Sequence, residues 1–277
     1  MKPLSGTAAG VPYTALPPSG GHGTSAPLIV TWHMLDAPRT DAAFAAALPL
    51  DGVPAWRVHL GMPMCGARMV DGRVDAAIEL IRRDPLLAYA APFVRQAAGE
   101  FPATLDAVRE QLPVDDGPIG ILGASLGAGV ALEVLASHEF TLGAVALVNP
   151  AIRARSTVGV IEAQLGQPYR WTDEARATAE ELDFVRRAGE VAQQVPLLVV
   201  SGEQDHATFR NDADEFVAAL RHQYERPDDV ETAIVPGLAH SLADEPGLEP
   251  APQLPRAALV DEVLTSWFDR QFTGPNA

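Results

Sequence analysis

Pro-Ile-Gly-Ile-Leu-Gly-Ala-Ser-Leu-Gly-Ala-Gly, residues 118–129, joins a short apolar strand to a Gly-x-Ser-x-Gly turn and the start of an Ala/Leu/Val-rich helix. A serine in such a sharp strand-to-helix turn has a strained backbone, and small neighbours let the strand and the helix approach each other. We therefore expect the hydroxyl of Ser125 to project above the sheet at the N-terminus of the following helix. This environment is typical of a nucleophile.

The same residues also fit a dinucleotide-binding turn. Residues 123–129 match the Gly-x-x-x-Gly-x-Gly turn of short-chain dehydrogenases, in which glycines make room for a phosphate. However, the turn lies near mid-chain, and the next predicted strand ends in Asn149, which is not an acid that could bind a ribose. Lys2 is the one lysine of the chain, so the Tyr-x-x-x-Lys pair of those enzymes is absent. The other alternative is a glycine-rich turn without chemistry.

Two later segments provide an acid and a base. Residues 196–205 form an apolar, β-branched strand that ends in a turn with carboxylates, and residues 231–240 form a strand that ends in a Pro-Gly turn and a histidine. The order along the chain is Ser125, Asp205, His240, each just after the carboxyl end of a predicted strand. In a parallel sheet these ends share one edge, so the three side chains can converge there.

These motifs resemble those of the α/β-hydrolases, specifically the dienelactone-hydrolase and prolyl-oligopeptidase-like esterases. The resemblance extends over Leu28–His240 and includes the patterns Gly202-x-x-Asp205 and Gly237-x-x-His240. It implies that the serine, aspartate and histidine act as nucleophile, triad acid and base. It does not identify a substrate, because esterases, peptidases and thioesterases share the scaffold.

Predicted strands and helices alternate, which favours an α/β fold with a mostly parallel central sheet and helices on both faces. We expect a single α/β-hydrolase domain over residues 1–277, with a small helical cap inserted at about 151–194, where α/β-hydrolases carry one. This interval contains an amphipathic helix over Asp173–Arg187. The other expected elements are an edge strand at Val11–Leu16 with a turn up to Ser25, strands at Leu28–His33, Trp56–Leu60 and Gly143–Val148, a helix at Asp41–Leu48 capped by Thr40, a long loop at Gly61–Arg73, helical segments from there to Leu112, and helices at Phe209–Arg221 and Arg256–Arg270.

The oxyanion of an acyl-transfer reaction needs backbone donors. One is expected to be the N–H of Leu126, the residue after the nucleophile. The second is expected from the turn after the first central strand, from Leu35 if the loop aligns on His33, or from Met34 if it is shifted by one residue. The resembling family usually has His-Gly here, whereas Met34 follows His33 in this chain and is expected to narrow the entrance, which favours small or flat acyl groups. The alternative is that these are ordinary loop residues.

Other side chains near the expected site have simpler interpretations. His33 is expected to order its loop beside the substrate. Met64 and Cys65, on the loop after a strand, are expected to line the substrate pocket, with Cys65 as a pocket wall and not as a second nucleophile. His206 is expected to be exposed, and Asp212 to be a helix cap or a solvated charge.

Three residues between the nucleophile and the acid also bear on the site. Asn149 lies where some relatives place their acid, a role that an amide cannot fill. Tyr169 and Trp171 lie on the predicted cap, where they either line the substrate entrance or pack against the cap helix, and we favour the second interpretation.

Composition limits the partners. The net charge of −16 argues against a nucleic acid or an anionic membrane surface as partner, and mildly against polyanionic substrates.

A chain of 277 residues with 47% hydrophobic content can bury a full core, and no segment approaches the length of a membrane span. A single cysteine excludes an internal disulfide, and no cofactor or metal is expected, since internal lysines and zinc-ligand spacings are lacking. Without a signal-peptide pattern at the start, a cytoplasmic location is expected.

Three functional classes follow from these residues. We favour a serine hydrolase that cleaves small to medium neutral carboxylic esters through an acyl-serine intermediate. The same triad could instead serve an acyltransferase, a thioesterase or a peptidase. The third class is a non-catalytic α/β-hydrolase-fold binding protein, which has no need to keep all three triad residues. The natural substrate and the oligomeric state do not follow from the sequence.

Overall fold

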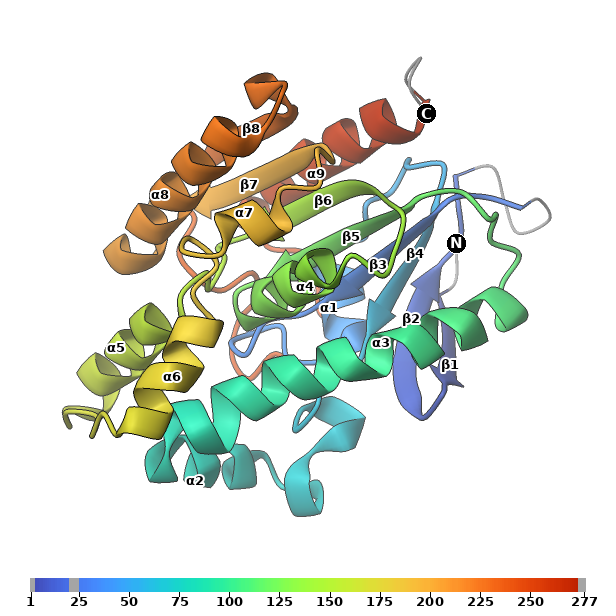
Figure 1. Ribbon diagram of the computed structural model, residues 1–277. Helices are drawn as coiled ribbons and strands as arrows, with labels where there is room; N and C mark the ends of the chain where they lie inside the picture. Colours follow the sequence, from blue (N-terminus) through green and yellow to red (C-terminus); the bar gives the residue numbers. More distant parts are fainter. Residues whose placement is uncertain (1–2, 20–24, 274–277) are drawn as a thin grey trace.

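The computed structural model describes residues 3–19 and 25–273, and its centre is a twisted, mostly parallel sheet (Figure 1). Within these residues the sheet has eight strands in the order β1-β2-β4-β3-β5-β6-β7-β8. They are β1 (Leu4–Ala8), β2 (Val11–Leu16), β3 (Leu28–Trp32), β4 (Trp56–Leu60), β5 (Ile119–Ala124), β6 (Leu142–Val148), β7 (Leu197–Gly202) and β8 (Val230–Val235). The pairs β1–β2 and β2–β4 are antiparallel, and the other neighbouring pairs, from β4–β3 to β7–β8, are parallel.

Strands β3 and β5 at the centre of the sheet are buried along their whole length because helices cover both of their faces. Every residue of β3 and β5 is buried, as expected for parallel strands between two helical layers.

The strand at Val11–Leu16 has the predicted bounds, but it is not the edge strand. β1 pairs outside it through a tight turn in which Ala9 and Gly10 both have positive φ, a backbone that suits a hairpin. The predicted turn up to Ser25 lies mostly outside the described residues.

The helices lie on the two faces of the sheet and beyond its carboxyl edge. They are α1 (Asp41–Ala47), α2 (Val74–Arg83), α3 (Ala91–Gln111), α4 (Leu126–Ser137), α5 (Ala154–Leu165), α6 (Asp173–Glu181), α7 (Ala188–Val191), α8 (Ala207–Gln223) and α9 (Pro255–Thr273), with shorter helical turns at Gly66–Arg68, Val70–Gly72, Pro85–Ala90 and Pro227–Asp229. Thr40 caps α1 as predicted, since its hydroxyl accepts the N–H of Ala43 at 3.1 Å.

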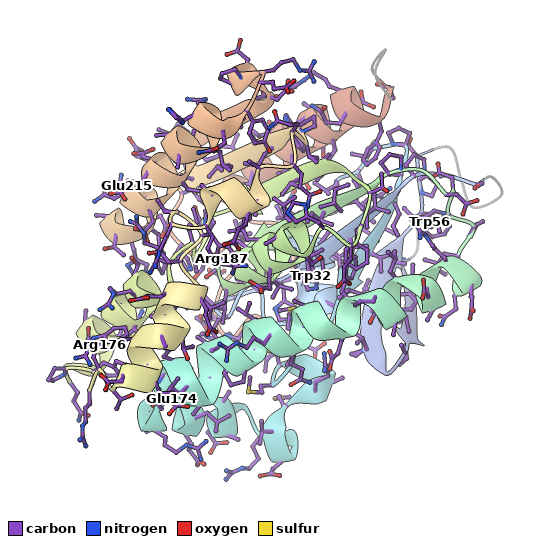
Figure 2. The ribbon with its side chains drawn as sticks, viewed as in Figure 1. Trp32, Trp56, Glu174, Arg176, Arg187 and Glu215 are labelled. Carbon is purple, nitrogen blue, oxygen red and sulfur yellow. The ribbon has the colours of Figure 1, made fainter. Side chains whose placement is uncertain are left out.

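Two buried clusters hold the layers together. On one face, α1 and α9 contribute Phe44 and Trp267 to a cluster against the sheet, and on the other face α3, α4 and α8 bury a larger set (Figure 1). Trp32 of β3 lies in this larger cluster (Figure 2), and its ring meets that of Phe101 of α3 edge-on, with the ring centroids 5.0 Å apart. No helix in the described ranges combines the length and the apolar character that crossing a membrane requires.

Helices α5, α6 and α7 occupy the interval predicted for a cap. The amphipathic helix predicted over Asp173–Arg187 is too long, because α6 ends at Glu181. The chain leaves the helix there to pair with the segment before α5: the N–H of Ala154 donates to Leu182 and the N–H of Phe184 donates to Ile152. Figure 2 shows Glu174 and Arg176 on α6, at the end of the molecule away from β8.

Candidate active site

Ser125 occupies a strained strand-to-helix turn between β5 and α4. Its φ of 49° and ψ of −118° are rare for a residue with a side chain. Three backbone hydrogen bonds hold it: its N–H donates to Val148 at 2.9 Å, and its carbonyl accepts from Ala128 at 3.0 Å and Ala151 at 3.1 Å. The predicted strand, turn and helix are therefore present, and the surrounding structure stabilises the strain.

Two glycines of the motif are required by close backbone contacts. A Cβ on Gly123 would lie 2.4 Å from the carbonyl oxygen of Gly127, and a Cβ on Gly127 would lie 2.3 Å from the carbonyl oxygen of Trp32. Real Cβ atoms do not approach backbone oxygens this closely. The Ser125 turn therefore lies directly against the end of β3, which brings the turn after β3 next to the serine.

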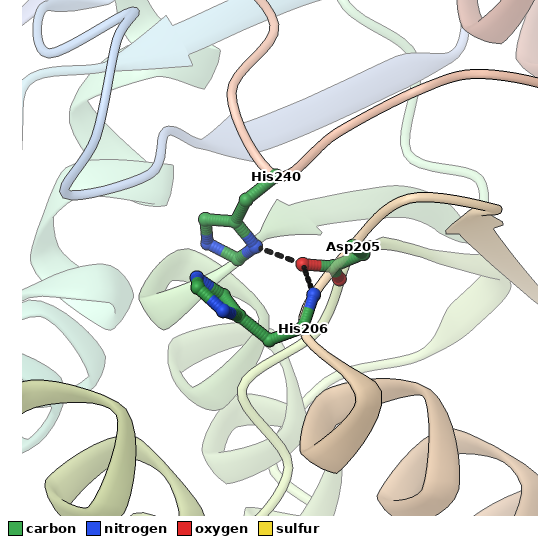
Figure 3. A group of neighbouring side chains, drawn as sticks. All are labelled: Asp205, His206 and His240. Atoms are coloured by element: carbon green, nitrogen blue, oxygen red, sulfur yellow. Dashed lines mark hydrogen bonds and ion pairs between the residues drawn. The ribbon is translucent and has the colours of Figure 1, made fainter. Parts of the chain in front are cut away.

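The hydroxyl, the imidazole and the carboxylate form one hydrogen-bonded relay. Ser125 Oγ lies 2.8 Å from His240 Nε2. On the other side of the ring, His240 Nδ1 lies 2.7 Å from Asp205 Oδ1, a contact that Figure 3 shows. The buried Asp205 carboxylate also accepts the backbone N–H of His206 at 2.6 Å. Because a carboxylate only accepts, Nδ1 carries the proton of the neutral ring and Nε2 is free to accept from the serine. The three side chains predicted to converge do so.

Asn149 holds the loop that carries His240, a role that the sequence interpretation missed. It follows β6 with a φ of 43°, and its side chain is fully buried. Its Nδ2 donates to the carbonyl oxygens of Ala239 and His240, both at 2.9 Å, and its Oδ1 accepts the N–H of Gly202 at 2.7 Å. The amide thus connects the loop of the base to the end of β7.

His206 and Phe209 pack against the imidazole of His240. The ring centroid of His206, which is predicted to be exposed, lies 5.4 Å from that of His240 (Figure 3), and the ring centroid of Phe209 lies 5.2 Å from it. Ligand atoms of Asp205, His206 and His240 lie within 4.8 Å of one another, a spacing that could hold a metal ion. Both nitrogens of His240 are already bonded to Ser125 and Asp205, so we interpret the group as a proton relay.

His33 orders the turn after β3. The ring is buried, with Nδ1 2.8 Å from the carbonyl oxygen of Met34 and Nε2 3.3 Å from the backbone N–H of Met62. Burial lowers the pKa of His33 to about 4, so the ring is neutral and both nitrogens are engaged by the backbone. The imidazole therefore contacts the loop and not the open site where it was expected to meet substrate.

The expectation that Met34 narrows the entrance is wrong. Its side chain is fully buried in the cluster under α1, together with Phe44 and Ala124, because the backbone turns it toward that face of the sheet. Leu35 is partly buried against the opposite cluster. The N–H of Leu126 begins α4, where the first amides of a helix have no intrahelical acceptor.

A small apolar pocket of about 40 Å³ lies beside this turn. Its lining is apolar apart from the side chain of Arg39 and includes Leu35, Met64, Cys65, Tyr89 and Leu248. Cys65 Sγ lies 3.9 Å from Tyr89 Oη, and burial raises the pKa of the thiol to about 11. A thiol with such a pKa is a weak nucleophile at neutral pH, which agrees with Cys65 as a pocket wall.

Asp36 is a second residue near the relay that the sequence interpretation missed. Its Oδ2 lies 3.6 Å from His240 Nε2, and its side chain is 40% exposed. The carboxylate thus lies on the same side of the imidazole ring as Ser125.

Ion pairs of Arg153 connect the interval predicted for a cap to α8. Asp212 is buried and not solvated as predicted, because Arg153 binds it at 2.9 Å and also binds Asp183 and Glu215. Burial raises the pKa of Asp212. This network joins α5 to α8.

Trp171 contacts Arg155 of α5, whereas Tyr169 also reaches outside the interval predicted for a cap. Their rings meet edge-on at 4.9 Å, Tyr169 Oη donates to Asp84 at 2.8 Å, and the guanidinium of Arg155 lies 4.2 Å from the Trp171 ring centroid.

Several solved structures share this fold. TT1662 from Thermus thermophilus is 20% identical with a TM-score of 0.62, and the match covers 97% of this chain and 99% of that one. An acylaminoacyl peptidase from Pyrococcus horikoshii is 16% identical, with a TM-score of 0.65, over 100% of this chain and 42% of that one. An esterase/lipase from an uncultured bacterium is 14% identical, with a TM-score of 0.62, over 99% of this chain and 85% of that one. At these identities the likeness shows the fold alone.

The chain spans about two fifths of the length of the peptidase that it matches. No curated protein matches it in sequence. The sequence profile of the prolyl oligopeptidase family matches residues 96–250, which include Ser125, Asp205 and His240. This match excludes the dehydrogenase alternative, and it confirms the resemblance inferred from the motifs. The chain belongs to the prolyl oligopeptidase family of serine hydrolases, and its fold is that of the α/β-hydrolases.

Proposed function

We propose that this serine hydrolase cleaves small to medium carboxylic esters through an acyl-serine intermediate. The sequence analysis favours esters that carry no charge. One observation carries the proposal: Ser125 Oγ, His240 and the buried Asp205 form a continuous relay with contacts of 2.8 and 2.7 Å. A serine hydroxyl is a poor nucleophile unless a base takes its proton, and His240 is placed to do so.

In the proposed mechanism, His240 Nε2 takes the proton of Ser125 Oγ as the oxygen attacks the ester carbonyl carbon. Asp205 stabilises the imidazolium through Nδ1. The oxyanion is assigned to the backbone N–H groups of Leu126 and Leu35, a contribution of about 3–4 kcal/mol for each donor. The imidazolium then protonates the alcohol as the carbonyl–oxygen bond breaks, and water repeats the sequence to release the acid and restore the serine.

A peptidase, thioesterase or acyltransferase would use the same residues. The peptidase alternative has specific support, because the structural neighbours include an acylaminoacyl peptidase and a puromycin-hydrolyzing peptidase from Mycobacterium tuberculosis (15% identity, TM-score 0.67, 98% of this chain and 39% of that one). A non-catalytic binding protein is disfavoured because the relay is fully assembled.

A fluorophosphonate probe with an ester series tests the proposal. We expect stoichiometric labelling of Ser125, no labelling of Ser125→Ala, and normal labelling of the control Ser266→Ala, whose serine is exposed on α9. Hydrolysis of p-nitrophenyl esters from acetate to decanoate should be fastest for the shorter chains, and an anilide and a thioester should be slower. If Ser125 is labelled but only the anilide or the thioester is cleaved, the protein is a peptidase or a thioesterase and not an esterase. If Ser125 is not labelled, the result favours a non-catalytic binding protein.

A further inference from the structure

Asp36 places a carboxylate beside the reacting atoms. Its Oδ2 lies 3.6 Å from His240 Nε2, and Ser125 Oγ lies 2.8 Å from the same nitrogen. With 40% of its side chain exposed, Asp36 is open to a molecule that approaches the serine. A carboxylate and a nucleophile therefore flank one nitrogen at the site where a substrate carbonyl must bind.

This carboxylate faces an acceptor in the resting enzyme. The proton of the neutral His240 ring is on Nδ1, toward Asp205, and the Nε2 lone pair receives the Ser125 hydroxyl. Nε2 therefore has no proton to offer Asp36 before the reaction begins. In the resting enzyme, His240 is therefore not a positive partner for Asp36.

The cationic side chain three residues further on is not that partner. Arg39 Nη2 binds both carboxylate oxygens of Glu245, at 2.7 and 2.8 Å. Within residues 3–19 and 25–273, the one ion pair recorded for Asp36 is the contact with His240. Its negative charge is therefore available to a substrate.

The apolar pocket next to this turn adds a second recognition element. Leu35 lines it and precedes Asp36 in the chain, and the pocket of about 40 Å³ has room for a small apolar group. Burial, and after it the contact with Cys65, raises the pKa of Tyr89 in the wall of this pocket, and the charges of Arg39 and Asp36 act on it with opposite signs as smaller contributions. The carboxylate and the pocket thus belong to one region of the molecule.

We propose that Asp36 selects substrates with a free ammonium group next to the scissile carbonyl, namely α-amino acid esters or amides with a small apolar side chain. The ammonium pairs with the Asp36 carboxylate, and the side chain enters the pocket beside Leu35. The proposal rests on the proposed serine-hydrolase function, and it refines the neutral-ester expectation by adding one positive charge to the acyl half. An ionic hydrogen bond of this kind corresponds to about a 10-fold to 100-fold preference in kcat/KM.

The test compares L-alanine ethyl ester with N-acetyl-L-alanine ethyl ester at pH 6.5, where the free α-amine is protonated. We expect the wild-type enzyme to favour the free amine about 10-fold or more in kcat/KM, and this ratio to approach one in Asp36→Asn. Added salt should reduce the wild-type ratio and leave that of Asp36→Asn almost unchanged, because salt screens a partly exposed ion pair.

Asp244→Asn is the matched control, since Asp244 is exposed on the loop after His240 and its loss changes the net charge equally. It should keep the wild-type ratio. Equal hydrolysis of both esters by the wild-type enzyme, or a wild-type ratio in Asp36→Asn, would overturn the proposal while the hydrolase function stands. If neither ester is cleaved and the fluorophosphonate leaves Ser125 unlabelled, the hydrolase function fails, and this inference fails with it.

Discussion

Replacing Asn149 tests whether the loop of His240 is held from outside the relay. Asn149→Ala removes the donors to the carbonyl oxygens of Ala239 and His240 and the acceptor of the Gly202 N–H. We expect both a loss of stability and a loss of activity, because the loop of the base and the end of β7 lose their common anchor.

The size of the effect follows from the buried groups. Each buried polar group left without a partner costs about 1 kcal/mol or more, and three lose their partner here. A left-handed backbone costs alanine about 1 kcal/mol more, because Asn149 has a φ of 43°. A total of about 3–5 kcal/mol corresponds to a fall in Tm of about 6–10 °C for a chain of this length. Because a displacement of about 1 Å at a catalytic group can cost 10²-fold, kcat should fall about 10-fold to 100-fold.

The assay combines thermal unfolding with kcat and KM for p-nitrophenyl acetate. Asn149→Gly removes the same hydrogen bonds without the backbone cost, so it should melt about 1 °C or more above Asn149→Ala and show the same loss of kcat. Asn149→Asp keeps the acceptor but loses both donors, and it should also lower kcat. Asn211→Ala, at an exposed position of α8, is the control. A merely structural role would lower Tm alone. An Asn149→Ala variant that melts within about 2 °C of the wild type with unchanged kcat would refute the reasoning.

Three further predictions follow from the site and the core. Asp205→Asn should keep the fold and lower kcat about 10²–10⁴-fold, since an amide does not hold the Nδ1–H form of His240; rapid-mixing kinetics with p-nitrophenyl acetate measure it, and a wild-type rate would assign the acid role to another carboxylate. Iodoacetamide should modify Cys65 only slowly at pH 7, since burial raises the pKa of the thiol to about 11, and rapid alkylation followed by mass spectrometry would contradict the pocket-wall assignment. Stability should fall as the pH drops below 6.5, because burial lowers the pKa of His33 to about 4 and of His59 to about 3, so the unfolded chain binds protons that the folded chain does not. Asp261 and Asp212 oppose this loss, since burial raises the pKa of both carboxyl groups, that of Asp261 to about 6. The net loss of stability at pH 5 is about 1–3 kcal/mol, which urea unfolding at pH 7 and pH 5 measures, and equal stability at the two pH values would contradict the burial of the neutral histidines.

The roles of residues that depend on their neighbours along the chain could be predicted from the sequence. The apolar run into Gly-x-Ser-x-Gly, the strands that end near Asp205 and His240, and the Thr40 cap each depend on neighbours along the chain. The convergence of Ser125, Asp205 and His240 followed because parallel strands end at one edge.

Residues whose partners are distant in the chain could not be predicted in this way. Asn149 reaches the His240 loop because β6 lies between β5 and β7, and Asp36 reaches His240 Nε2 because β3 lies beside β5. The side chain of Met34 is buried because the turn after β3 directs it toward α1, and Asp212 is buried because Arg153 crosses from the cap. Local sequence limits backbone geometry and hydrophobic period, whereas burial and charge pairing depend on which strands and helices become neighbours in space.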